Sequence, residues 1–212
     1  MVAKRIKKVV GMLMVSVMLI GQAGTVFAAE GGNELAPYEA ELNTLNEELG
    51  TDYALQQSDG TSYEEMVEFF TSMSMDEFDA YIHDAYVAEK EFEEKEGSEL
   101  IAIMDENVNT RSTLSTQKFY YDGSNYLYMK AYTTTVSGQT IYTGDVSSTG
   151  WSISSYPAYK STSCTVSFSS DKKSATCKYN CTRYVSANVI STGIYTKTCT
   201  FSAGGGNLYP VV

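Results

Sequence analysis

Four cysteines are the candidates for metal binding, redox chemistry or disulfide formation in this sequence. Cys164, Cys177, Cys181 and Cys199 follow the pattern Cys-x12-Cys-x3-Cys-x17-Cys. A zinc site would need closely spaced ligand pairs, and a dithiol redox site would need Cys-x-x-Cys. Neither spacing is present, and the sequence after residue 112 holds no histidine. The pattern therefore predicts two disulfide bonds, with no metal ion or other cofactor.

The pairing of these cysteines depends on a predicted β-hairpin. A turn at Ser170-Asp171 would place Cys164 opposite Cys177, and opposed residues have Cα atoms about 4.5–5.5 Å apart. A disulfide needs about 4.4–6.8 Å. Cys177 and Cys181 would lie about 13 Å apart on one strand, which is too far to bridge. Two pairings remain, and we expect Cys164–Cys177 together with Cys181–Cys199.

The sequence gives little support for acid–base or nucleophilic catalysis. A serine or cysteine nucleophile needs a positioned base, and the one histidine, His83, lies in an acidic segment where a helix surface is expected. A glycosidase needs two carboxylates across a cleft. The glutamates of the first half are expected on solvated helix faces. The sequence therefore predicts a protein that is not an enzyme.

One predicted strand carries an aromatic strip. Its two faces alternate, so that one is apolar and buried while the other, with tyrosines around a lysine, faces outward. An exposed aromatic strip could stack on sugar rings or meet another protein. The alternative is that the sandwich or the helical half covers these tyrosines. The candidate ligand-binding residues are Tyr126, Tyr128, Lys130 and Tyr132.

The N-terminal 28 residues have the pattern of a secretory signal peptide. A basic segment precedes an apolar run from Val9 to Ile20, and small residues at Val26 and Ala28 indicate cleavage after Ala28. The run is shorter than the roughly 20 residues that a spanning helix needs. We expect a secreted, extracellular protein with no membrane span once the signal is removed.

The rest of the chain divides by charge and composition. Residues 30–112 hold 23 acidic residues against three cations, a net charge of −20. Residues 113–212 hold eight cations against three aspartates, a net charge of +5. This asymmetry predicts an acidic region at 29–112 and a Ser/Thr/Tyr-rich domain at 113–212, with the boundary within 105–117.

The acidic region is predicted to be helical. Apolar residues recur at helix spacing after Pro37, and Gly50 can end that element. Ser62 with Glu65 (or the pair one residue earlier) and Ser74 with Glu77 offer capping boxes for two further helices, the last running to about residue 96. Residues 52–57 read as a short extended segment. The Met and aromatic stripe is expected to form a core rather than a partner groove.

The second half is predicted to be all-β. Short runs rich in Tyr, Thr, Val and Ile alternate with turn sequences at 8- to 14-residue spacing. This spacing indicates an antiparallel sandwich or small barrel. The fold class is therefore α+β in sequence order, with a small helical region followed by the β domain.

Two functional hypotheses follow. The first is a secreted non-enzymatic binding or surface-interaction protein for an unknown protein or glycan. The alternative is a precursor of an antimicrobial or toxin-like β domain, masked by an acidic pro-region that is cut near Arg111. Both allow the two halves to dock, with Phe69, Phe70 and Phe78 as apolar contacts. The strong acidity argues against nucleic-acid binding. The general make-up resembles uncharacterised exported proteins of Gram-positive bacteria.

Overall fold

The computed structural model describes residues 33–95, 100–102, 113–122 and 124–210. The two predicted processing positions, Ala28 and Arg111, lie outside these residues, as does the predicted end of the last helix at about residue 96. The described residues belong to one compact unit. Within them, no helix is both long enough and apolar enough to cross a bilayer.

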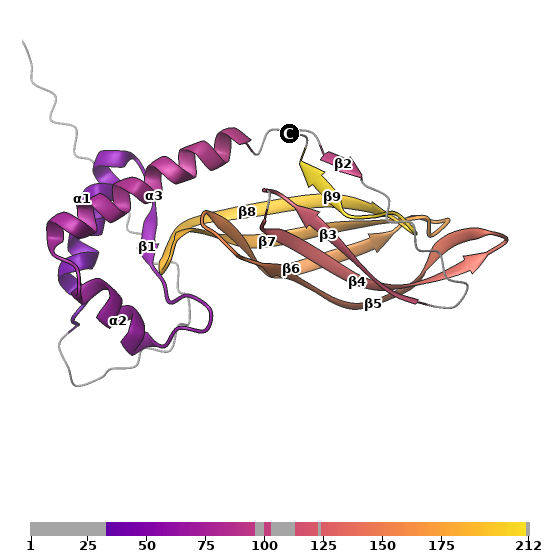
Figure 1. The fold of residues 1–212 in the computed structure, drawn as a ribbon, viewed down its shortest axis with the longest axis horizontal. Coiled ribbons are helices and arrows are strands. Elements are labelled where there is room, and N and C mark those ends of the chain that lie inside the picture. The colour runs from indigo at the N-terminus through magenta and orange to yellow at the C-terminus, as the bar shows by residue number, and fades with distance from the viewer. Residues whose placement is uncertain (1–32, 96–99, 103–112, 123, 211–212) are drawn as a thin grey trace, which may run out of the picture. The chain divides into compact units, whose positions relative to one another are not determined.

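In the part of the chain that the structure describes, three helices form where the local sequence predicts them (Figure 1): α1 at Ala36–Leu49, α2 at Tyr63–Thr71 and α3 at Met75–Lys95. Gly50 ends α1 in the left-handed conformation with φ 68°, which glycine adopts without a steric cost. Ser62 and Glu65 form a reciprocal capping box at the start of α2. Ser74 and Glu77 exchange the same kind of hydrogen bonds before α3. Side-chain caps therefore set the starts of two helices.

The helices pack their apolar stripes into a shared core, as their periodicity predicts. Phe70, Phe78 and Ile82 are fully buried there. The ring centroids of Phe70 and Phe78 lie 5.7 Å apart in an edge-to-face arrangement. Val185 and Val189, which come from the β half, belong to the same cluster. The helical core is therefore completed by residues of the β region.

Within the described ranges, nine strands form two sheets, and the predicted α+β class with an antiparallel sandwich is confirmed (Figure 1). One sheet has the order β1-β8-β7-β6 and the other β2-β9-β3-β4-β5. Neighbouring strands are antiparallel except for β3 and β9. The bounds are Tyr53–Leu55 for β1, Leu100–Ala102 for β2, Thr113–Tyr120 for β3, Tyr126–Val136 for β4, Gln139–Ser152 for β5, Ala158–Phe168 for β6, Ser174–Ser186 for β7, Val189–Ser202 for β8 and Leu208–Pro210 for β9.

Two of these strands come from the acidic half. The extended segment predicted at residues 52–57 forms β1, which pairs with β8 so that Tyr53 lies opposite Ser191. Strand β2 pairs with β9. Backbone hydrogen bonds therefore cross the boundary that composition indicates.

The sandwich core lies between the two sheets. On β4, Leu127, Met129 and Ala131 are fully buried, which confirms the predicted inward face. They meet Tyr179 of β7 and Phe201 of β8 in one cluster. The buried side continues to Thr133. Because side chains alternate along a strand, the alternate residues from Tyr126 to Tyr132 point outward.

Candidate functional site

The outward side chains of β3 and β4 form a surface that we call the tyrosine–lysine face. The register pairs Lys118 with Tyr128 and Tyr120 with Tyr126. Three of the four predicted ligand-binding residues are partly exposed, and the side chain of Tyr132 is 39% exposed. The structure therefore places all four on one side of one sheet. The face consists of Lys118, Tyr120, Tyr126, Tyr128, Lys130 and Tyr132.

Rings and ammonium groups alternate on this face. The ring centroids of Tyr120 and Tyr126 lie 5.0 Å apart, and those of Tyr126 and Tyr128 lie 6.5 Å apart. The Nζ of Lys118 lies 4.3 Å from the Tyr126 centroid, and that of Lys130 lies 5.5 Å from the Tyr128 centroid. These are cation–π distances. A hydrogen bond with Ser152 lowers the pKa of Tyr126, and Lys118 adds to this effect.

A glycine holds one of these rings in place. Gly150 of β5 lies opposite Tyr128 in the register. A Cβ built at Gly150 would come within 2.7–2.8 Å of three atoms of the Tyr128 side chain. The tyrosine therefore packs directly against the backbone of β5, and any side chain at position 150 would push it away.

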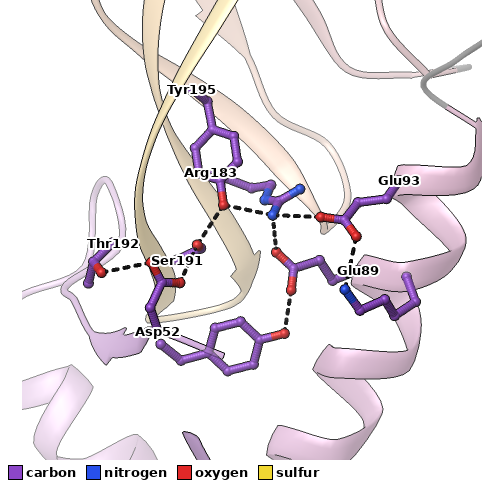
Figure 2. Close-up of polar contacts among 9 residues, drawn as sticks. Asp52, Glu89, Glu93, Arg183, Ser191, Thr192 and Tyr195 are labelled. Carbon is purple, nitrogen blue, oxygen red and sulfur yellow. Dashed lines mark hydrogen bonds and ion pairs between the residues drawn. The ribbon is translucent and has the colours of Figure 1, made fainter. Parts of the chain in front are cut away.

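A second cluster is polar and buried (Figure 2). Arg183 of β7 is 5% exposed and Glu89 of α3 is 3% exposed. The Nη2 of Arg183 lies 2.6 Å from Glu89 Oε1 and 3.0 Å from Glu93 Oε1. It also donates to the Tyr195 hydroxyl at 2.7 Å, and the guanidinium carbon lies 4.1 Å from the Tyr195 ring centroid. A charge pair therefore connects α3 to the sheet.

Hydroxyl groups extend this cluster toward the start of β1. Ser191 donates to Asp52 Oδ1 at 2.6 Å, so the Tyr195 hydroxyl, 2.6 Å away, donates to Ser191. Thr192 donates to the other Asp52 oxygen at 3.0 Å. Tyr53 donates to Glu89. These contacts join α3, the start of β1 and the sheet, although Arg183 Nε is buried without a hydrogen-bond partner, and we assign the cluster a structural role.

Burial and charge act in opposite directions on the buried pair. Burial raises the pKa of Glu89, while the Tyr53 hydrogen bond and Arg183 oppose that rise. Burial lowers the pKa of Arg183, but the charges of Glu89 and of the neighbouring tyrosines, with the Glu93 hydrogen bond, together outweigh burial and raise it. Because a guanidinium stays protonated in proteins, we take the two side chains as an ion pair.

The prediction that the helix glutamates form a solvated face is wrong for Glu89. Its position gives a signal that could have shown this. The buried residues of α3 are Phe78, Ile82, Ala85, Glu89 and Phe92, which recur every three or four residues. A carboxylate in an apolar stripe at helical spacing requires a buried cationic partner.

The cysteine register differs from the prediction. Cys164 lies opposite Tyr179, and Cys177 lies opposite Cys199. The β6–β7 register differs because the turn is longer than two residues: the Ser169 N–H donates to the Ser174 carbonyl, and Lys172 has φ 57°. This longer turn shifts the strand register by two residues. The expected opposition of Cys164 and Cys177 is therefore wrong, and Cys181 lies opposite Tyr195.

All four cysteines carry free thiols in the structure. Cys177 Sγ lies 3.4 Å from the Met129 sulfur. The hydrogen bond with Cys164 lowers the pKa of Cys177, but the bond with Cys199 and burial outweigh it and raise the pKa to about 12. Reactive cysteines have lowered pKa values. Cys177 therefore has the environment of a structural residue, and the oxidation of the four cysteines to disulfides stays a prediction.

His83 lies on the surface of α3, as predicted, with its side chain 42% exposed and its Nδ1 2.7 Å from Asp79. The described residues contain no group of three His, Cys, Asp or Glu side chains that could hold a metal ion.

Comparisons with known proteins give no family. No protein-family model matches this chain, and no curated protein matches it. One solved structure, titled hypothetical protein lmo2686 from Listeria monocytogenes EGD-e, aligns with 52% of this chain and 90% of its own. The TM-score is 0.29 and the sequence identity is 16%. A likeness this distant carries no argument about function.

Proposed function

We propose that this protein is an exported, non-enzymatic binding protein that holds a polysaccharide chain on the tyrosine–lysine face. The observation that carries the proposal is the alternation on β4, where Leu127, Met129 and Ala131 fill the core. The tyrosines between them are thereby left outside. Export is supported by the signal-peptide pattern that ends at Ala28.

The chemistry of the face favours a sugar polymer over a protein. Tyrosine presents an apolar ring and a polar hydroxyl at its tip, which suits a sugar ring with its apolar faces and hydroxyl edge. Thr116 and Ser148 lie on either side of Lys130 in the register and add hydroxyl groups. The cores of protein interfaces are depleted in lysine. Lys118 and Lys130 sit among the rings, so a protein partner fits this face less well.

The contacts of the acidic region support its permanent place in the protein. Removal of residues 29–112 would take Glu89 and Glu93 away from Arg183. It would also take β1 from the edge of β8 and expose Val185 and Val189. Apolar surface that is returned to water costs about 25 cal/mol per Å². This cost weighs against the precursor hypothesis, in which a cut near Arg111 releases the β domain.

Two measurements test the proposal. The first is the intact mass of the protein from culture medium, for which we expect a chain that begins at Ala29. A product that begins after Arg111 would support the precursor hypothesis instead.

The second measurement is co-sedimentation with insoluble Gram-positive cell-wall polysaccharide, chitin and cellulose. We expect the wild type to sediment with at least one of them, and Tyr126→Ser/Tyr132→Ser to lose most of that binding. Tyr63→Ser is the matched control, because Tyr63 is 51% exposed on α2. Equal binding by both variants, or no binding by the wild type, would contradict the proposed function.

A further inference from the structure

A surface cavity of about 220 Å³ lies at the junction of the helical half and the sandwich. Ser58 and Asp59 line it from the loop between β1 and α2, and Trp151 and Ser152 line it from the end of β5. Tyr156 follows β5, and Tyr184 belongs to β7. Pockets for drug-sized ligands measure about 300–1,000 Å³, so this cavity has room for one small ring.

Three aromatic side chains give the cavity its apolar walls. Trp151 is the one tryptophan of the chain. The ring centroids of Tyr156 and Tyr184 lie 6.4 Å apart with an interplanar angle of 41°. Tyr156 is 41% exposed whereas Tyr184 is buried. A ligand can therefore reach the tyrosine at the rim and displace water from the apolar walls.

The charges at the rim restrict the chemistry of that ligand. Lys160 pairs with Asp59, and its Nζ lies 5.6 Å from the Trp151 centroid and 6.0 Å from the Tyr184 centroid. The cation–π position that an ammonium ligand would seek is thus already taken by a lysine. An anionic ligand would in turn meet the Asp59 carboxylate. The balanced pair favours a ligand without net charge.

The polar groups that remain suit hydroxyl groups. Asp59 accepts hydrogen bonds and Lys160 donates them. The Ser58 hydroxyl accepts from the Asn188 N–H and can still donate, and the Ser152 hydroxyl, which donates to Tyr126, can still accept. Ser152 also lies opposite Tyr126 in the β4–β5 register, which brings the cavity next to one end of the tyrosine–lysine face. A neutral ring with several hydroxyl groups satisfies both the walls and the rim.

We infer that this cavity is a subsite for one neutral sugar ring, which deepens the proposed function and rests on it. The subsite recognises a terminal or branch residue of the glycan whose chain lies on the tyrosine–lysine face. The acidic half supplies Ser58 and Asp59, so it contributes to binding directly.

Trp151 makes the test direct, because tryptophan fluorescence reports on this cavity alone. The full exported chain is titrated with methyl glucoside, N-acetylglucosamine, mannose and galactose, and separately with glucuronate and choline. We expect a saturable change in emission with at least one neutral sugar and a response at least tenfold weaker with the two charged probes. No saturable change with any neutral sugar, or tighter binding of either charged probe, would overturn the inference.

Variants separate the subsite from the face. Tyr156→Ala should weaken the sugar response at least tenfold, and Tyr156→Leu, which keeps the apolar bulk, should weaken it less. Tyr63→Ala should leave it unchanged, with circular dichroism showing that each variant folds. Tyr126→Ser/Tyr132→Ser should keep the sugar response but lose polysaccharide sedimentation. If Tyr156→Ala binds sugar like the wild type, the subsite is refuted while the face proposal stands. Sedimentation lost by neither variant would instead refute the face.

Discussion

The replacement Glu89→Ala should destabilise this protein strongly, because it leaves the Arg183 guanidinium buried without its closest carboxylate. Arg183 is 5% exposed and Glu89 is 3% exposed. Breaking a buried pair of this kind costs about 3–5 kcal/mol. Glu93 keeps its contact with Arg183 at 3.0 Å and compensates for part of the lost charge, although its side chain is 37% exposed and screened by water. We therefore expect the lower part of that range, about 3 kcal/mol.

Removing both charges should cost much less than removing one. In Glu89→Leu/Arg183→Met an apolar pair of similar volume replaces the ion pair, and such replacements are often neutral. The Tyr53 hydroxyl loses its acceptor in this variant. An unsatisfied buried hydroxyl costs about 1–3 kcal/mol, and we expect a loss in free energy of unfolding near the bottom of that range.

Urea denaturation provides the assay, with two signals that report on different parts of the protein. Fluorescence of Trp151 follows the sandwich, and far-ultraviolet circular dichroism follows the helices. The two transitions should coincide if the helices and sandwich unfold as one unit. Glu94→Ala is the matched control on the exposed side of α3, with an expected change within about 0.5 kcal/mol. If Glu89→Ala costs no more than Glu94→Ala, the assignment of a structural ion pair is wrong.

Three further outcomes follow from the geometry. Trypsin should cut the protein so that each cysteine lies on a separate peptide. After oxidation with oxidised glutathione, we expect the Cys177 and Cys199 peptides to be linked, because these residues lie directly opposite each other. A Cys164–Cys177 link would contradict this prediction. Gly150→Ala should displace Tyr128, cost about 1–3 kcal/mol through overpacking and weaken polysaccharide sedimentation, whereas Ser148→Ala should change stability little. The Asp79 backbone and side chain raise the pKa of His83. The wild type should therefore be more stable than His83→Gln below about pH 6.5 and should lose this advantage as the pH rises through the folded pKa. An equal difference in melting temperature between wild type and variant at pH 5 and pH 8 would exclude the effect.

Short-range chemistry made much of this fold predictable. Helix starts follow from Ser62 with Glu65, and α1 ends at Gly50, because caps and left-handed glycines depend on a few neighbouring residues. The inward side of β4 follows from the alternation of Leu127, Met129 and Ala131, since the period of a strand is two. The outward position of the tyrosines on β4 was readable from the same pattern.

Contacts between distant segments decided the rest. The turn at Ser169–Ser174 shifted the β6–β7 hairpin by two residues, which changed the β6 neighbour of Cys177 from Cys164 to Val166. On its other side, Cys177 lies opposite Cys199 of β8. A register cannot be read from alternation alone, because a shift of two residues keeps every side chain on the same face. The cavity likewise joins residues about 90 positions apart, Asp59 and Trp151. Glu89 became a buried ion-pair partner only through the strand that carries Arg183, since burial of a charge depends on what packs against it and not on its own neighbours in the chain.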